Sequence, residues 1–474
     1  MTFQSVEYIL FFPIVFILYW TLFNKNKNLQ NGLLLTASLL FYAYWDWRFL
    51  GLLLFTAFST FFAGLLLEKN YSQKKRKLIS TISIVSNLLI LLYFKYYNFF
   101  VESFIDSFSI LGLGELNFKT LNIILPVGIS FYTFTALSYS IDVYQRKINA
   151  TKDILAYLAF VTFFPSILSG PINRAQKQLP QYFEKRTFNY DNAIEACKCI
   201  LVGGVMKLCL ADRLGIYVDS VYANIIHHNG STLLFTSILY SIQLYADFAG
   251  YSLMAIGSGK LLGINLQENF NRPFFAKTVT EFWRRWHISL TTWFRDYIYF
   301  PLGGNKVRKV RWMLNTLIVF VISGLWHGAR YTFIMWGFIH GICMIIERLL
   351  YGERIKKISD SFSIPNLIRM MITFCIITFT FIFFRAETLH DALLIIQKIA
   401  TTSGSIFMDK SNLLLAFISM IFVFTYDIIK EYNIKFHLFE SKYSIIRYAT
   451  AALAICYILA FGVLNGGSFI YFQF

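Results

Sequence analysis

Long apolar runs recur along the whole chain, and they constrain its fold more than any other feature. A helix needs roughly 20 predominantly apolar residues to cross about 30 Å of hydrocarbon. The chain is 57% hydrophobic and only 15% charged, whereas soluble domains contain about 25% charged residues. The sequence therefore predicts an all-α integral membrane protein with about eleven transmembrane helices plus re-entrant or in-plane helices.

The apolar runs follow one another without a linker, a low-complexity tract or an internal repeat, which favours a single polytopic domain over residues 1–474. The first run, residues 6–23, has no preceding Lys or Arg and no small-residue cleavage site, so we expect it to stay as the first span. A later run is interrupted at Ser169-Gly-Pro171. This interruption predicts a broken or re-entrant helix, whose backbone must be surrounded by protein or by a water-filled cavity.

The net charge of +17 is compatible with nucleic-acid binding, but the basic residues lie in short connections between apolar runs. The positive-inside bias of membrane proteins explains that placement, so we expect no nucleic-acid partner. The connection over residues 99–120 is mainly acidic and is predicted to be an external loop. The six cysteines lie mostly inside apolar stretches and show no paired CxxC spacing, so neither a disulfide framework nor a metal site is predicted.

A polar and aromatic stretch over residues 281–296 contains His287. Continuous helical spacing would align Trp283, His287, Leu290 and Phe294 on one face, so His287 is predicted to point with the apolar stripe. An ionisable group in a membrane domain is a candidate for function. A hydrogen-bonded core histidine fits the same pattern equally well.

A second histidine, His327, lies within the apolar run over residues 312–346. Gly328 beside it lacks a side chain, which would let a substrate or another helix approach closely. A neutral imidazole can accept a proton from a hydroxyl near physiological pH. Helix packing is the alternative for His327, and it is the predicted role of His340, which would face elsewhere on an unbroken helix.

Several segments of the chain resemble the membrane-bound O-acyltransferase (MBOAT) family, in particular its bacterial branch that O-acetylates polysaccharides such as alginate and peptidoglycan. Their signature core covers about residues 126–346. The resemblance implies a helical fold enclosing a tunnel, with His327 as the catalytic histidine and His287 at the second signature position. Leu253 departs from the branch pattern, which has Asp after Gly-Tyr-Ser. The segments are Ser138-Tyr-Ser-Ile-Asp142, Phe164-Pro-Ser-Ile-Leu-Ser-Gly-Pro-Ile172, Asp247-Phe-Ala-Gly-Tyr-Ser252, Glu268-Asn-Phe-Asn271, Glu281 to Leu290, Arg295-Asp-Tyr297, Leu302-Gly-Gly-Asn305 and Gly324-Leu-Trp-His-Gly-Ala329.

The last residues, Phe469-Ile-Tyr-Phe-Gln-Phe474, resemble the C-terminal Phe-x-Tyr-Phe-x-Phe motif of envelope-acylation systems. The resemblance implies that Tyr471 is an acyl relay, which carries the acyl group as a phenolic ester. An aromatic belt at the membrane boundary explains the same residue types equally well.

The resemblance also implies a reaction. An acetyl group would pass from cytoplasmic acetyl-CoA across the bacterial inner membrane to peptidoglycan or an alginate-like exopolysaccharide, with an extracytoplasmic SGNH-type acetyltransferase as partner and membrane lipids as surroundings. No permanently bound cofactor is expected. Arg284 and Arg285 are candidates for binding the CoA phosphates, and positive-inside bias accounts for them as well.

Other functions remain open at this point. D-alanyl transfer to teichoic acid shares the same signatures but uses a carrier protein as donor. A transporter of a lipid-linked glycan would also have many spans and buried polar groups, although transporters often show internal repeats. An inert scaffold would leave His287 and His327 without a role.

Overall fold

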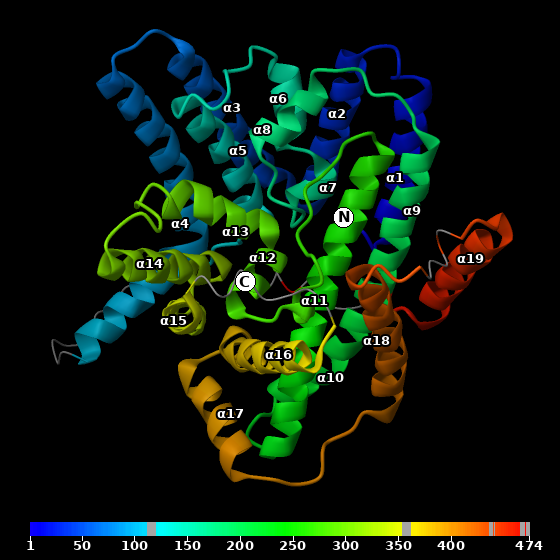
Figure 1. Ribbon diagram of the computed structural model, residues 1–474. Coiled ribbons are helices and arrows are strands. Elements are labelled where there is room, and N and C mark those ends of the chain that lie inside the picture. Colours follow the sequence, from blue (N-terminus) through cyan, green and yellow to red (C-terminus); the bar gives the residue numbers. More distant parts are fainter. Residues whose placement is uncertain (111–119, 353–361, 436–438, 440, 465–469, 471–474) are drawn as a thin grey trace. The chain divides into compact units, whose positions relative to one another are not determined.

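The computed structural model describes all residues except 111–119, 353–361, 436–438, 440, 465–469 and 471–474. Throughout the described residues every regular element is a helix (Figure 1), which confirms the predicted all-α class. The chain forms two compact units, Met1–Cys197 with Ala255–Gln267 and Lys198–Met254 with Glu268–Phe474. The single functional domain over the whole chain stays a prediction.

Seven helical stretches of the described chain are long and apolar enough to cross a membrane. They confirm a multi-pass membrane protein, while the expected total of about eleven spans stays a prediction. The expected first span is a shorter apolar helix, α1 (Val6–Thr21). The seven stretches are Lys27–Glu68, Gln73–Phe108, Lys309–His327, Tyr331–Tyr351, Ile364–Arg385, Lys410–Glu431 and Ser444–Phe461.

The first unit is built around α3 (Leu50–Glu68), which packs against α4 (Gln73–Ile110) and α5 (Ile129–Tyr144). Gly64 makes the contact with α5 close, because a Cβ there would lie 2.6 Å from the ring of Tyr139. The other elements of this unit are α2 (Lys27–Asp46), η1 (Trp47–Phe49), α6 (Ile154–Val161), α7 (Phe164–Ile167), α8 (Ala175–Gln178), η2 (Leu179–Tyr182) and most of α9 (Tyr190–Gly204).

The external loop predicted over residues 99–120 is wrong in its first part. Helix α4 continues to Ile110 because this segment remains rich in aromatic and aliphatic residues between its acidic side chains. Residues 111–119 lie outside the described part of the chain.

The predicted break at Ser169-Gly-Pro171 is confirmed, since α7 ends at Ile167 and α8 begins only at Ala175. Neighbouring side chains satisfy polar groups around the break. The hydroxyl of Ser38 accepts the Phe164 N–H at 3.0 Å, and the Asn173 amide donates to the Ser166 hydroxyl at 2.9 Å. For these two groups, protein partners take the place of water.

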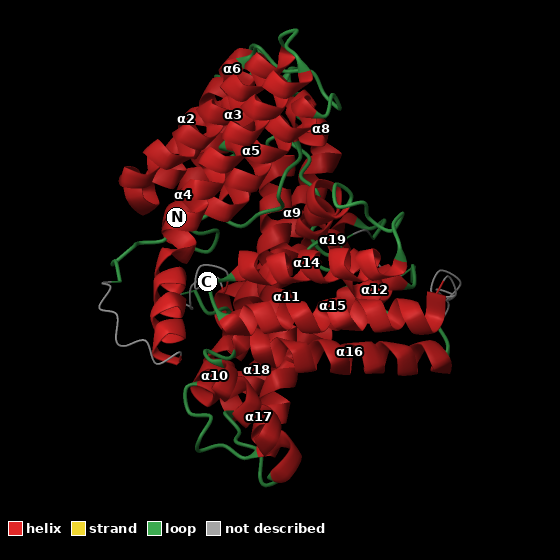
Figure 2. Ribbon diagram, turned by 90° about the vertical axis from the view of Figure 1, so that its left-hand side faces the viewer, coloured by secondary structure: helices red, strands yellow, loops and turns green. Residues whose placement is uncertain are grey.

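The second unit contains an antiparallel pair of helices, α14 (Lys309–His327) and α15 (Tyr331–Tyr351). Helix α16 (Ile364–Arg385) lies beside α15, so that the three helices form a row (Figure 2). The other elements are η3 (Val205–Ala211), α10 (Asp212–Tyr222), most of α11 (Gly230–Leu261), η4 (Pro273–Phe275), α12 (Val279–Arg285), α13 (Ile288–Phe294), η5 (Arg295–Tyr299), α17 (Leu389–Thr401), α18 (Lys410–Glu431) and α19 (Ser444–Phe461).

Two glycines let α14 and α15 touch backbone to backbone. A Cβ on Gly324 would collide with the carbonyl oxygen of Phe333, and a Cβ on Gly337 would collide with that of Phe320. Small residues commonly permit such close approach between helices in membranes. The contact fixes the end of α14, where His327 is the last residue.

We expect Gly337→Ala to lower the free energy of unfolding by about 1–3 kcal/mol, because the added methyl group overpacks a closed contact. Gly51→Ala is the matched control, since nothing lies within 4 Å of a Cβ at this helical glycine. The control should leave stability unchanged or slightly raised. Thermal unfolding of both variants in one detergent measures the difference, and equal midpoints would contradict the close contact.

Candidate active site

His287 occupies a junction between two short helices. Helix α12 ends at Arg285, and α13 begins at Ile288. The backbone of His287 is left-handed, with φ 43°, a conformation that is uncommon for residues other than glycine and that clusters at functional sites. The predicted continuous helical face is therefore wrong. The predicted inward direction of His287 is confirmed, because the residue is only 1% exposed.

Asn269 holds this turn through three hydrogen bonds. Its side-chain amide donates to the Ser252 hydroxyl at 3.0 Å, and its side-chain oxygen accepts from the Ser289 hydroxyl at 2.6 Å. Its backbone carbonyl accepts the Ile288 N–H at 2.8 Å. Asn269 is buried, and hydrogen bonds are electrostatically stronger away from water. The residues after His287 are thus fixed by contacts from distant parts of the sequence.

Helix α12 is also fixed at its beginning. The Thr278 hydroxyl accepts the Glu281 N–H at 3.0 Å, and the carboxylate of Glu347 accepts the N–H groups of Val279 and Thr280, each at 2.8 Å. A helix this short is unstable alone. Caps from its own first turn and from α15 therefore set the direction in which α12 approaches His287.

His327 ends α14, and Gly328 follows it in an extended conformation. The histidine is 3% exposed. Its ring centroid lies 5.1 Å from that of Trp336 and 5.2 Å from that of Phe384. Of the two close neighbours predicted for Gly328, the structure shows another helix, since a Cβ there would collide with the ring of Phe333 in α15.

The structure brings the two predicted histidines together in one aromatic cage. Their ring centroids are 6.4 Å apart. Trp326 lies against both rings, at 5.8 Å from His287 and 5.1 Å from His327. Phe248 packs on His287 at 4.7 Å. Burial lowers the pKa of His287 to about 3, so its ring is neutral at physiological pH.

His340 is a hydrogen-bonded core histidine, which confirms its predicted packing role. The indole N–H of Trp283 donates to its Nδ1 at 3.3 Å, and its Nε2 lies 2.9 Å from the Thr380 hydroxyl. Both ring nitrogens therefore have partners inside the protein.

A cavity of about 640 Å³ adjoins the two histidine-bearing segments, a volume in the range of ligand pockets. Trp283 and Ile288, on either side of His287, contribute to its wall. Ser323 also lines it, about one helical turn before His327. Three basic side chains and several aromatic rings complete the wall, including Arg284, Arg295, Arg348, Phe300, Trp312 and Phe320.

The adjacent candidates Arg284 and Arg285 have different surroundings. Arg284 lines the cavity. Arg285 forms ion pairs with Glu281 at 2.7 Å and with Glu431 at 2.9 Å, and Arg272 also pairs with Glu431 at 2.7 Å. Arg285 thus connects α12 to α18. For both Arg284 and Arg285, contact with a donor phosphate stays a prediction.

The predicted relay residue Tyr471 lies outside the described residues. Sequence reasoning missed other groups that the structure places here, above all Asn269, Arg295 and Arg348. Asn269 and Arg295 occur within the family-like segments, and that was their only signal in the sequence.

Several known proteins are similar to this chain in sequence. A probable alginate O-acetylase of Pseudomonas syringae pv. tomato is 38% identical over 390 residues, covering 82% of this chain and 73% of the relative. The peptidoglycan O-acetyltransferase of Helicobacter pylori is 32% identical over 422 residues, covering 83% and 78%. The teichoic acid D-alanyltransferase of Bacillus subtilis is 28% identical over 283 residues, covering 57% and 71%.

The family pattern itself matches residues 39–386, a range that contains both histidines and every residue of the cavity wall. The match extends beyond the signature core expected from the sequence in both directions. The chain is an acyltransferase and belongs to the membrane-bound O-acyltransferase family.

Proposed function

We propose that this acyltransferase passes an acetyl group from cytoplasmic acetyl-CoA across the bacterial inner membrane toward a cell-envelope polysaccharide. The observation that supports this most is the meeting of His287 and His327 in one cage beside an arginine-lined cavity. The acetyl-transferring relatives match more of the chain, at higher identity, than the D-alanyl-transferring one. We therefore favour acetyl transfer over D-alanyl transfer.

The cavity wall offers the donor both positive charge and apolar surface. Arg284, Arg295 and Arg348 line it, and guanidinium groups bind phosphate oxygens through charge-assisted hydrogen bonds. The aromatic part of the wall offers an apolar surface for the pantetheine arm. Within α14, Ser323 is the last residue that lines the cavity, and His327 ends the same helix. In our proposal, a thioester bound along this wall presents its reactive carbon to the histidines.

In the proposed reaction His327 acts as a general base. Its imidazole accepts the proton of an acceptor hydroxyl while that oxygen attacks the thioester carbonyl carbon. The new ester C–O bond forms, the C–S bond breaks, and the imidazolium returns the proton to the departing CoA sulfur. The neutral ring of His287 can donate a hydrogen bond, and a donor aimed at the carbonyl oxygen would stabilise its developing charge.

The first acceptor in this proposal is the phenolic hydroxyl of Tyr471. The serine of an extracytoplasmic SGNH-type partner then attacks the phenolic ester, and its proton goes to the departing oxygen of Tyr471. A hydroxyl of peptidoglycan or an alginate-like exopolysaccharide then takes the acetyl group and returns a proton to the serine. This order moves the acetyl group across the membrane without moving CoA. The names of the relatives support a polysaccharide as the final acceptor.

We expect His327→Ala to lower the transfer rate by roughly 10²- to 10⁴-fold, the usual contribution of general-base assistance. Ester-linked acetate is released by mild base from purified peptidoglycan and from extracellular polysaccharide, at matched membrane abundance of each variant. His227→Ala, at an exposed loop histidine, is the control. Wild-type ester content in every polymer of the His327 variant would refute the assigned base.

The two adjacent arginines should respond differently to substitution. Arg284→Gln removes a charge from the cavity wall, so we expect a higher KM for acetyl-CoA with an unchanged unfolding temperature. Arg285→Gln breaks two ion pairs with carboxylates, so we expect a lower unfolding temperature. Initial rates over a range of acetyl-CoA concentrations and thermal unfolding give both values, and an unchanged KM for the Arg284 variant would contradict this donor site.

Tyr471→Phe tests the relay, because it keeps the ring and removes the acceptor oxygen. We expect the purified variant to lose hydroxylamine-labile acetate from its C-terminal peptide and to stop supplying the partner. Peptide mass spectrometry after incubation with acetyl-CoA measures the first effect. Transfer equal to that of the wild type would mean that the aromatic residue serves only as a membrane-boundary anchor.

A further inference from the structure

A buried ion-pair triad lies in the second unit, outside the proposed site. The Lys207 amine is 2.7 Å from a carboxylate oxygen of Asp212 and 2.5 Å from one of Asp247. All three residues are buried. Such groups are costly to remove from water, and apolar side chains of similar volume often give equal or greater stability. A role beyond stability would account for the triad.

The local backbone is arranged to form this triad. Lys207 lies in η3, a segment of π-helix, and short π-helical segments frequently occur at functional sites. Gly250 of α11 allows a close contact with the end of α9 and with η3, because a Cβ there would lie 2.8 Å from the carbonyl oxygen of Gly203 and 2.9 Å from the backbone nitrogen of Lys207. Asp247 precedes Gly250 by about one helical turn. The glycine contact therefore places its carboxylate beside Lys207.

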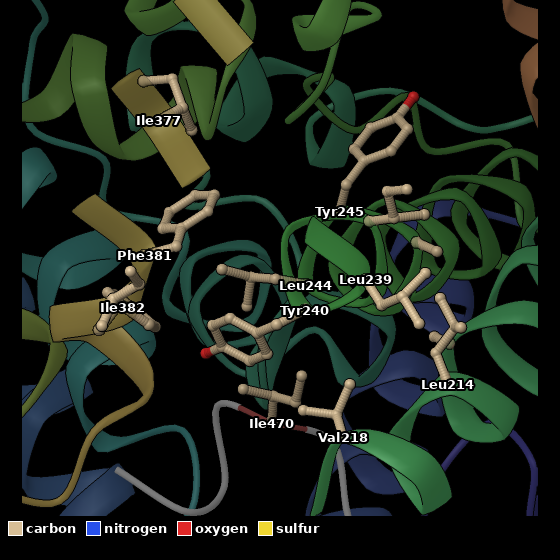
Figure 3. Close-up of a cluster of buried hydrophobic side chains, with 14 of the residues drawn as sticks. Leu214, Val218, Leu239, Tyr240, Leu244, Tyr245, Ile377, Phe381, Ile382 and Ile470 are labelled. Atoms are coloured by element: carbon tan, nitrogen blue, oxygen red, sulfur yellow. The ribbon is translucent and has the colours of Figure 1, made fainter. Parts of the chain in front are cut away.

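The second oxygen of Asp247 binds the C-terminal end of the chain. It accepts the Ile470 N–H at 2.9 Å, while the first oxygen pairs with Lys207. The side chain of Ile470 is buried in the same hydrophobic cluster as Val218, Tyr240 and Phe381 (Figure 3). This cluster also includes Trp336 and Phe384, which pack against His327. Ile470 thus joins the core that supports the proposed site.

A second point of attachment lies where α19 ends. Arg213, next to Asp212, donates from Nε and Nη2 to the Phe461 carbonyl at 2.9 and 2.7 Å. The Leu208 carbonyl of η3 accepts the Val463 N–H at 3.0 Å. The chain that leaves α19 is therefore bound to η3 and α10 soon after the helix ends, and to Asp247 at Ile470.

We propose that Lys207, Asp247 and Arg213 form an anchor for the C-terminal tail, the chain that follows α19, and that this anchor sets the reach of Tyr471. Tyr471 follows Ile470 directly in the sequence. Lys207 fixes the rotation of the Asp247 carboxylate, so that one oxygen faces the tail. The three residues are positioning residues. The contacts alone support the anchor, whereas its effect on Tyr471 rests on the proposed function.

The decisive experiment removes the donor at Ile470 without touching the triad. Ile470→Pro eliminates the backbone N–H, and Ile470→Val keeps both the N–H and a branched apolar side chain. Deuterium uptake of the C-terminal peptide is followed by mass spectrometry in the full-length detergent-solubilised protein. We expect uptake roughly tenfold to a hundredfold faster in the proline variant, the range for losing a hydrogen bond to a charged group. The valine variant should match the wild type.

Substituting each of the two carboxylates of the triad gives a matched pair of variants for the same measurement. In Asp247→Asn a single oxygen must serve both Lys207 and the Ile470 N–H, so the tail should exchange faster. Asp212→Asn removes the other buried carboxylate charge beside Lys207 and leaves the Ile470 bond intact, so the tail should keep its protection. Equal tail exchange in the two asparagine variants, or wild-type exchange in Ile470→Pro, would overturn the anchor.

A separate assay distinguishes failure of the anchor from failure of the relay. Acetate on the C-terminal peptide is measured after incubation of each variant with acetyl-CoA. We expect less acetate in Ile470→Pro than in Ile470→Val, together with faster exchange. Faster exchange without acetate on the wild-type tail would keep the anchor and refute the relay. Unchanged exchange with normal acetate on the wild-type tail would refute the anchor and keep the relay.

Discussion

The hydrogen bonds of Asn269 hold the turn on which the arrangement of the two histidines depends. A left-handed backbone at a residue other than glycine costs of order 1–3 kcal/mol and persists only where its surroundings enforce it. Without that enforcement, α12 and α13 would tend to continue as one helix. His287 would then leave the cage that it shares with His327. The proposed acyl-transfer site therefore depends on an amide side chain that contributes no catalytic group of its own.

Local signals in the sequence predicted a large part of the fold. Apolar run length indicated membrane helices, the Gly-Pro pair at residues 170–171 indicated the break before α8, and His327 was recognisable as an ionisable residue within an apolar run. The turn at His287 could not be predicted in this way. The residues around it keep a helical period, and the groups that interrupt the helix, Asn269 and Ser252, are remote in the sequence.

The pairing of charged residues could not be predicted from local sequence either. Arg284 and Arg285 are equivalent in the sequence, but only Arg285 meets the carboxylates of Glu281 and Glu431. Lys207 stands within an apolar run, and nothing near it in the sequence indicates its pairing with Asp247. Glu431 and Asp247 are both distant along the chain from the basic residue that each one pairs with, and local sequence therefore does not reveal which side chain is neutralised inside the protein.

The position of His327 at the end of α14 has an electrostatic consequence. The peptide dipoles of a helix add up to about half a negative charge at its C-terminal end, and a cation there is stabilised by about 0.3–1 kcal/mol, or up to about 2 kcal/mol where it is partly buried. In the proposed transfer the imidazole becomes positively charged for as long as it holds the acceptor's proton. The field of α14 then offsets part of the cost of creating that charge among aromatic rings.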